Sequence, residues 1–219
     1  MTIDKKLFLY IFIGFILLTI VGVVSHEYAH YIVARLCGFK HAHTSYAYTR
    51  LSTANDTLIK SSINRSYTQS AKEQRPYLLT FMAGPIETIA VGTLGFILLT
   101  VHRRSFFKST TLSLKQWVLV FLSLFWLRPA LFLVGTVHSM SAATVLSTGK
   151  DEGKIARYLH INPLWVCIIP GIIGCSIITI VIIRYIPQKE RFTFICAGIA
   201  GAIAGSWIWL DKFGPMIMP

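Results

Sequence analysis

Charged residues are scarce in this chain, and acidic ones most of all. Asp, Glu, Lys and Arg together make up 14% of the 219 residues, only 9 residues are acidic, and 54% are hydrophobic. A soluble domain carries about 25% charged residues, which keep its surface in water. The composition therefore argues against an ordinary soluble enzyme and indicates a protein embedded in a lipid bilayer.

Cysteine is rare as well. The chain has four cysteines, which lie within or beside apolar segments at no spacing typical of metal-binding cysteines: Cys37, Cys167, Cys175 and Cys196. A cysteine in such surroundings is usually a small buried hydrophobic residue. We therefore expect buried free thiols and no disulfide framework.

The excess of positive charge does not indicate a nucleic-acid-binding protein. The net charge is +12, but Lys and Arg occur in short clusters between apolar segments, as in the loops of membrane proteins. The sequence contains no nucleic-acid recognition motif. We expect the lipid bilayer as a partner and nucleic acid as none.

Long apolar segments are what the sequence has in abundance. About 18 or more apolar residues in succession are enough to cross the hydrocarbon core as a helix. Five such helices are predicted, at residues 7–37, 77–101, 117–145, 164–183 and 192–210. Gly38 suits the end of the first, Pro129 predicts a kink in the third, and Gly201 and Gly205 give the fifth a small-residue packing face.

A polar segment follows the first helix, and its residues 41–49 are rich in β-forming types, which predicts a strand or hairpin. His41 and His43 would share one strand face, and we interpret them as solvated because no carboxylate or cysteine accompanies them. The expected fold is an all-α polytopic, multi-pass integral membrane protein with this small β-prone segment. Residues 1–219 are expected to form one membrane-embedded domain.

The first helix carries the most informative motif, Ser25-His26-Glu27-Tyr28-Ala29-His30. Residues four apart lie on one helix face, so His26 and His30 can bind one metal ion together. Glu27 lies about 100° round the helix from His26, where its carboxylate can take a proton from water at the metal. Ionisable residues within an apolar helix are costly and usually functional. The motif predicts a zinc hydrolase site.

Other ionisable residues are expected at the same membrane level. With five spans, the end of the first, the start of the second and the loop after the third lie on one side, so the histidine pair can converge with Glu87 and Asp151. Asp151 also suits the N-cap of a short helix that stops at Asn162-Pro163.

Glu87 is the only charged residue in the predicted second span, and two interpretations are open. It is either a protonated, hydrogen-bonded core residue or a group that acts near the metal. Arg128, within the predicted third span, needs a partner at that depth, and Glu87 is one candidate.

At these residues the sequence resembles the intramembrane site-2 zinc metalloproteases. The resemblance rests on the histidine motif, on Val33-Ala34-Arg35-Leu36-Cys37-Gly38 after it, and on Ala83-Gly84-Pro85-Ile86-Glu87-Thr88, which is similar to the family's Gly-Pro segment. It covers roughly the first hundred residues well and the later part loosely. The family's third ligand is the aspartate of an Asp-Gly motif; Asp151 matches it, with Glu152 inserted before Gly153. Thr88 stands where the family usually has asparagine.

The resemblance implies a zinc-dependent metalloendopeptidase that hydrolyses peptide bonds in or near the transmembrane segments of a membrane-protein substrate. It implies Zn²⁺ held by His26, His30 and Asp151, with Glu27 as the general base. His138 and Glu152 are the rival third ligands.

Two other classes of function stay open from the sequence. One is a catalytically inactive, protease-like membrane protein that acts as a binding or scaffold protein. The other is a membrane zinc enzyme that acts on soluble or membrane-surface segments. A metal transporter is disfavoured, because the fourth and fifth spans have almost no polar residues.

Overall fold

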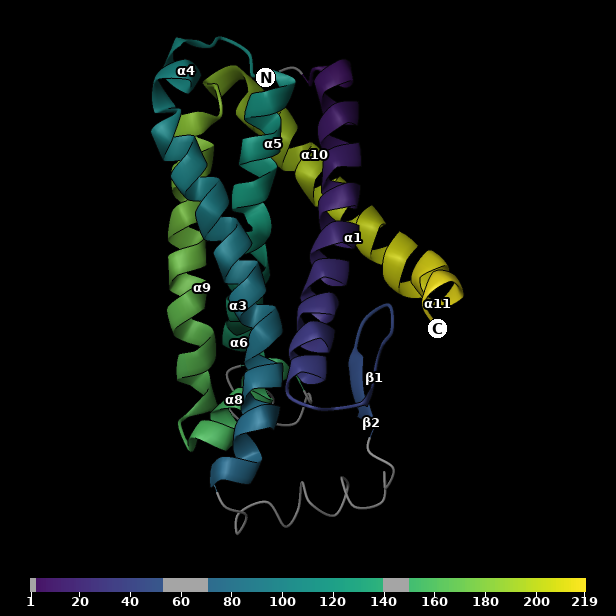
Figure 1. Ribbon diagram of the computed structural model, residues 1–219. Helices are drawn as coiled ribbons and strands as arrows, with labels where there is room; N and C mark the ends of the chain where they lie inside the picture. The colour runs from purple at the N-terminus through teal and green to yellow at the C-terminus, as the bar shows by residue number, and fades with distance from the viewer. Residues whose placement is uncertain (1–2, 53–70, 140–149) are drawn as a thin grey trace.

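Long helices packed side by side make up most of this protein (Figure 1), and the computed structural model describes residues 3–52, 71–139 and 150–219. In this part of the chain, five helical segments are long and apolar enough to cross a membrane: Lys5–Leu36, Arg75–Val101, Leu114–His138, Pro163–Tyr185 and Gln188–Ile217. The predicted all-α, multi-pass membrane fold is confirmed.

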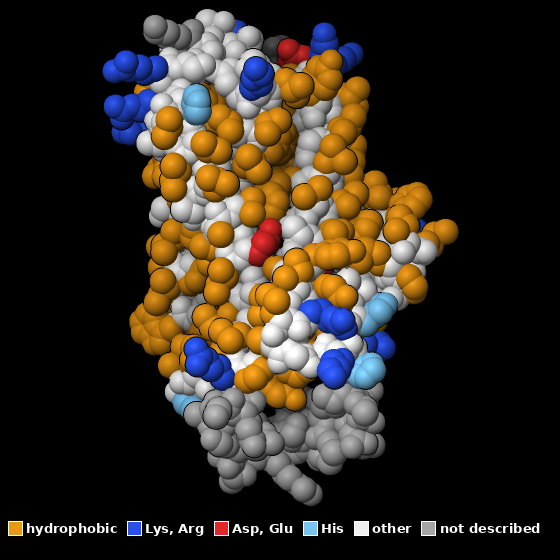
Figure 2. Space-filling view, viewed as in Figure 1, with side chains coloured by type: hydrophobic (Ala, Val, Ile, Leu, Met, Phe, Trp, Pro, Cys, Tyr) orange, Lys and Arg blue, Asp and Glu red, His pale blue; other side chains and the backbone are white. Residues whose placement is uncertain are grey.

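The surface of the bundle agrees with a bilayer environment. Figure 2 shows hydrophobic side chains over the middle of the visible face, with Lys and Arg gathered towards its two ends. Large apolar side chains lie exposed on several helices, among them Leu17, Ile97, Ile172 and Ile199. An apolar surface of this extent favours aggregation in water, whereas lipid tails solvate it.

The first helix, α1 (Lys5–Leu36), lies within two residues of its predicted bounds. It begins after Asp4, whose Oδ1 accepts hydrogen bonds from the backbone N–H groups of Lys6 and Leu7 at 3.0 and 3.1 Å. Past its end, Gly38 has a φ of +93°, which glycine adopts without strain. The predicted stop at this glycine is confirmed.

The second helix, α3 (Ala71–Val101), begins six residues before the predicted start at residue 77. The extra turns carry charged residues, and hydropathy detects the membrane part of a helix and not its polar extension. After α3, a short helix, α4 (Arg103–Lys108), leads towards the third span.

The third span is broken. It consists of α5 (Leu114–Ser123), a 3₁₀ turn, η1 (Leu124–Trp126), and α6 (Leu127–Ser139). Pro129 lacks an N–H group and its ring crowds the carbonyl four residues earlier, at Phe125, which lies in the 3₁₀ turn. The α-helix is thus interrupted by a 3₁₀ turn one turn before Pro129, where the kink was predicted. The predicted end of this span, residues 140–145, lies outside the described residues.

The last two spans each contain a π-helical turn. α9 (Pro163–Ile180) continues into η2 (Val181–Tyr185), and α10 (Gln188–Ser206) continues into η3 (Trp207–Phe213) and α11 (Gly214–Ile217). The predicted spans 164–183 and 192–210 lie inside these segments. As with α3, the spans predicted from hydropathy do not include the polar ends of these helices.

The predicted small-residue face of the fifth span packs on α1. A β-carbon on Gly201 would lie 2.5 Å from the carbonyl oxygen of Phe12, and one on Gly205 would lie 3.0 Å from the α-carbon of Ile16. Close backbone approach of this kind drives helix association in lipid, where burying apolar surface gains little. Aromatic rings fill the core beyond it, with Phe15 and Phe194 5.5 Å apart between centroids.

A β-hairpin and a short helix lie at the end of the bundle where α1 finishes (Figure 1). Strands β1 (His41–Thr44) and β2 (Thr49–Ser52) are antiparallel, with Thr44 opposite Thr49, which confirms the predicted hairpin. His41 and His43 are exposed, as expected of a solvated strand face. The turn is held by the chain end, since the N–H of Tyr46 donates to the carbonyl of Met218 at 3.0 Å.

The short helix, α8 (Asp151–Leu159), corrects one prediction. Asp151 is its first helical residue, and Lys150 occupies the N-cap. The helix ends before His160, which adopts a left-handed φ of 55°, and so it stops short of Asn162. The Asp151 side chain is engaged elsewhere.

The four cysteines are free thiols, as expected, but only Cys167 is buried; Cys37, Cys175 and Cys196 are partly exposed.

Candidate metal centre

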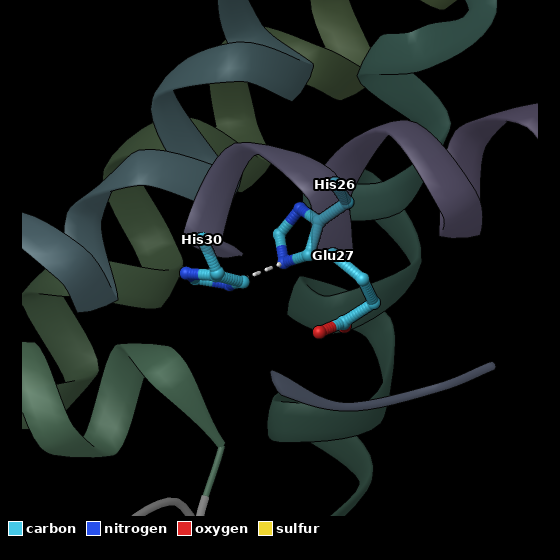
Figure 3. A group of neighbouring side chains, drawn as sticks. All are labelled: His26, Glu27 and His30. Carbon is cyan, nitrogen blue, oxygen red and sulfur yellow. Dashed lines mark hydrogen bonds between the residues drawn. The ribbon is translucent and has the colours of Figure 1, made fainter. Parts of the chain in front are cut away.

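His26 and His30 point their imidazole rings at one another from consecutive turns of α1 (Figure 3). Both are almost fully buried, with 0% and 4% of their surface exposed. Their Nε2 atoms lie 3.2 Å apart. The i, i+4 spacing thus places two ring nitrogens at one point inside the bundle.

Asp151 completes this arrangement from the start of α8. Its Oδ2 lies 3.2 Å from Nε2 of His26 and 3.1 Å from Nε2 of His30. The three atoms form a nearly equilateral triangle. The predicted convergence of the histidine pair with Asp151, from segments more than a hundred residues apart, is therefore present in the structure.

The outer nitrogen of each ring is held by α3. Thr88 Oγ1 lies 3.0 Å from Nδ1 of His26, and because this hydroxyl donates its own hydrogen to the carbonyl of Gly84 at 3.1 Å, it accepts one from the ring. Nδ1–H of His30 donates to the carbonyl of Thr80 at 2.6 Å. Both Nε2 atoms are then left with free lone pairs that point into the triangle.

Two imidazole lone pairs and a carboxylate oxygen are all acceptors, and they repel one another at about 3 Å unless a proton or a cation lies among them. Metal-binding histidines commonly donate their second nitrogen to a protein oxygen, as both rings do here. The donor set therefore fits a metal ion.

Gly84 provides the space for the rings. A β-carbon at this position would lie 2.4 Å from Nε2 of His30 and 2.5 Å from Nε2 of His26. Any side chain there would displace both imidazoles, so the glycine of the Gly-Pro segment is required by contact with the histidines.

Glu27 lies beside the pair, and its carboxylate is directed to the same side of α1 (Figure 3). The ligand atoms of His26, Glu27 and His30 lie within 4.8 Å of one another. The hydroxyl of Thr49, the first residue of β2, is 3.2 Å from Oε2 of Glu27 and 2.9 Å from its backbone carbonyl. The hairpin thus contacts the carboxylate predicted to act as a base.

The charge of Asp151 is stabilised by its neighbours. Burial alone would raise the pKa of this carboxyl group, but its contacts with His26 and His30 and the charge of nearby Lys154 hold the pKa well below its usual value. Nζ of Lys154 lies 3.5 Å from Oδ1 of Asp151. The neighbouring carboxyl group of Glu152 differs, since burial raises its pKa. Of these two adjacent carboxyl groups, Asp151 is therefore the one whose anionic form the surroundings favour.

A cavity of about 410 Å³ opens in front of these residues. Glu27, His30 and Asp151 lie in its wall, and residues from β2, α3, α6 and α8 complete it: Thr49, Leu51, Phe81, Arg128, Phe132, Lys150, Glu152 and Lys154. The cavity provides room for a second molecule at the histidine pair.

Neither of the rival third ligands contacts the histidine pair. His138 is exposed near the end of α6, and no hydrogen bond or ion pair among the described residues joins it to His26 or His30. Glu152 lines the cavity, but Asp151 alone of the two acidic residues contacts the histidines.

The suggested pairing of Glu87 with Arg128 is wrong. Within the described chain, the ion pairs all involve Asp151, and Arg128 instead lines the cavity. The carboxylate of Glu87 lies 3.3 Å from the hydroxyl of Thr88, so it is beside the threonine that holds His26.

Three residues of this site were not predicted as part of it: Thr49, Thr80 and Thr88. Thr80 acts through its backbone carbonyl, for which a sequence holds no signal. Thr88 stands where the family has asparagine, and Thr49 belongs to a β-prone stretch; neither pattern predicts a contact with the histidine motif.

Comparisons of this chain with protein-family models, with curated proteins and with solved structures found no match. The arguments about its function therefore rest on the geometry of the site.

Proposed function

We propose that this protein is an intramembrane zinc metalloendopeptidase, similar to the site-2 proteases, that hydrolyses peptide bonds in or near the transmembrane segments of other membrane proteins. One observation carries the proposal. A triangle of two buried imidazole nitrogens and one carboxylate oxygen lies next to a separate carboxylate, and a cavity opens onto them.

The size of the triangle supports zinc. Zinc binds histidine nitrogen and carboxylate oxygen at about 2.0–2.1 Å with tetrahedral geometry, which places its ligand atoms about 3.3 Å apart. The sides of 3.1–3.2 Å are close to this value. His26, His30 and Asp151 would hold the ion, and three protein ligands are the usual number in catalytic zinc sites.

The ion, when bound, would supply Lewis acidity, which makes water more acidic and a carbonyl more electrophilic. Glu27 would take the proton of the attacking water and deliver it to the leaving amine. Thr49 would keep the Glu27 carboxylate turned towards the cavity. The histidines and Asp151 would keep their positions because Thr80, Thr88 and Lys154 hold them from outside.

The hairpin suggests how a substrate would bind. Thr49 and Leu51 of β2 line the cavity, and a strand with a free edge can pair with an extended peptide. A transmembrane helix would have to unwind locally to present a peptide bond there, since its backbone groups are otherwise bonded internally.

The experiment that tests the proposal compares wild type with Glu27→Gln in purified, detergent-solubilised protein. Bound zinc would be measured by mass spectrometry and cleavage with a reporter transmembrane segment. We expect one zinc per chain in both proteins and cleavage by the wild type alone.

Glu190→Gln is the matched control. Glu190 is also buried, but it lies at the start of α10, where the neighbouring Thr193 accepts a hydrogen bond from the N–H of Asp4 at the far end of α1. This variant should cleave like the wild type. Equal cleavage by Glu27→Gln would reject the general base, and binding of the reporter without cleavage by any of the proteins would favour the scaffold function.

A further inference from the structure

A second cavity, of about 190 Å³, lies between α3, α6, α8 and α9. Its lining is mainly apolar and includes Met82, Ile89, Pro129, Ile155, Val166 and Cys167. Binding sites for small groups in proteins are typically concave and apolar, with a few polar groups that fix orientation. This cavity has that character.

The two cavities share a wall. Arg128, Phe132 and Glu152 line both of them. Phe132 is covered by Nζ of Lys150, 4.5 Å from the ring centroid. These three residues therefore form the boundary between the two cavities.

The shared wall is also where the polar groups of the second cavity gather. Arg128 offers five N–H donors, and within the described chain no hydrogen bond or ion pair engages them. Glu152 offers carboxylate oxygens beside it. An arginine in a membrane-spanning segment is costly unless it has a partner or a function, and a peptide backbone crossing this wall would supply hydrogen-bond acceptors and donors to both residues.

The second cavity lies directly behind a metal-ligating ring. Thr88, whose hydroxyl accepts the hydrogen bond from Nδ1 of His26 at 3.0 Å, belongs to its lining. A group bound in the second cavity is thus separated from the ring of His26 by this one threonine. This places the cavity beside the histidine pair, on the outer side of the His26 ring.

We propose that the second cavity is a specificity subsite, which holds one large apolar side chain of the substrate, such as leucine or phenylalanine, beside the scissile bond. This rests on the proposed peptidase function. The wall shared with the metal-site cavity identifies the occupant as part of the same peptide: Arg128 and Glu152 face its backbone, and the apolar interior takes its side chain.

Two substitutions change the cavity in opposite directions. Cys167→Leu adds bulk at its buried wall on α9, and Ile155→Ala removes bulk on α8. Cys175→Leu is the matched control, since Cys175 lies two turns further along α9 and outside the lining. The substrates are reporter segments with Ala, Leu or Phe at each position flanking the cleaved bond, and the readout is the ratio of kcat/KM values.

At one flanking position, we expect wild type and Cys175→Leu to prefer Leu or Phe over Ala. Cys167→Leu should shift this ratio towards Ala by about 10-fold, and Ile155→Ala should shift it towards Phe, since one methylene in an apolar pocket changes discrimination by about 10-fold or more. Opposite shifts cannot arise from partial unfolding. Unchanged ratios in both variants, or an equal shift in Cys175→Leu, would overturn the subsite.

A binding measurement separates this inference from the peptidase proposal. A reporter segment carrying a photoreactive benzoyl-phenylalanine at the same position is cross-linked to wild type and to Glu27→Gln, and the cross-links are mapped by mass spectrometry. Cross-links to Met82 or Cys167 are expected. If these appear while the wild type cleaves nothing, the peptidase function fails and the binding subsite stands. Cleavage by the wild type with cross-links only at other residues would overturn the subsite. So would a co-purified lipid that Cys167→Leu displaces without altering the kcat/KM ratios.

Discussion

Gly84 lies against His30 so closely that a β-carbon on it would come within 2.4 Å of the ring nitrogen Nε2. The same atom would lie 2.5 Å from Nε2 of His26. A helix that contributes none of the three atoms of the triangle thus determines whether the two rings can meet. The backbone of α3 shapes the site as much as the side chains of α1 do.

Gly84→Ala should abolish metal binding, because the added methyl group would occupy the position of the two ring nitrogens. Gly22→Ala is the control: Gly22 also lies in a membrane helix, and a β-carbon there would have no neighbour within 4 Å. Zinc content after dialysis distinguishes the two. Retention of wild-type zinc by Gly84→Ala would show that the rings do not bind metal in this arrangement.

Asp151→Asn should lower zinc affinity by at least about 100-fold, since replacing even an outer partner of a ligand costs 10–100-fold. The amide retains the size of the carboxylate but not its charge. Glu152→Gln and His138→Gln test the rival ligands and should retain zinc, because neither residue contacts the histidine pair. Competition with a zinc-binding dye measures the zinc affinity of all three variants. Loss of zinc in His138→Gln alone would show that His138, and not Asp151, is the third ligand.

Thr88→Val should weaken zinc binding by about 10-fold, because the ring of His26 loses the acceptor for its Nδ1–H and with it a fixed orientation. Valine matches threonine in shape. Thr100→Val is the control on the same helix, since Thr100 likewise bonds the carbonyl four residues earlier, at 2.9 Å, but far from the site. Equal zinc affinities for wild type and Thr88→Val would show that this hydrogen bond does not orient the ligand.

Thr49→Val should lower kcat for the reporter by about 10-fold and leave zinc content unchanged, since we propose the carboxylate that Thr49 contacts as a base and not as a metal ligand, and catalysis by a base requires accurate positioning. Thr49→Ser keeps the hydroxyl and should restore the rate. If Thr49→Ser is as slow as Thr49→Val, the methyl group or the strand matters and the hydrogen bond to Glu27 does not.

The membrane fold was predictable because its signal is local. A segment such as residues 164–183 is apolar along its whole length, and lipid requires a helix of any such segment, since its backbone groups have no other hydrogen-bond partner. The turn residue Gly38 and the kink near Pro129 follow from φ preferences and a missing N–H. The polar ends of α3 and α10 were missed, because outside the hydrocarbon core hydropathy carries no information on helix length.

Within the site, the sequence determined what depends on spacing along one helix: His26 and His30 share a face, and Glu27 lies beside them. Topology placed Asp151 on the same side of the bundle. Tertiary structure alone decided the rest, because contacts between elements depend on how each helix is rotated about its axis. The rotation of α8 points Asp151 at the histidines instead of at its own helix terminus, and that of α6 directs Arg128 to the cavity and not to Glu87. The rotation of α3 brings Gly84 and Thr88 into contact with α1, and the packing of the hairpin does the same for Thr49.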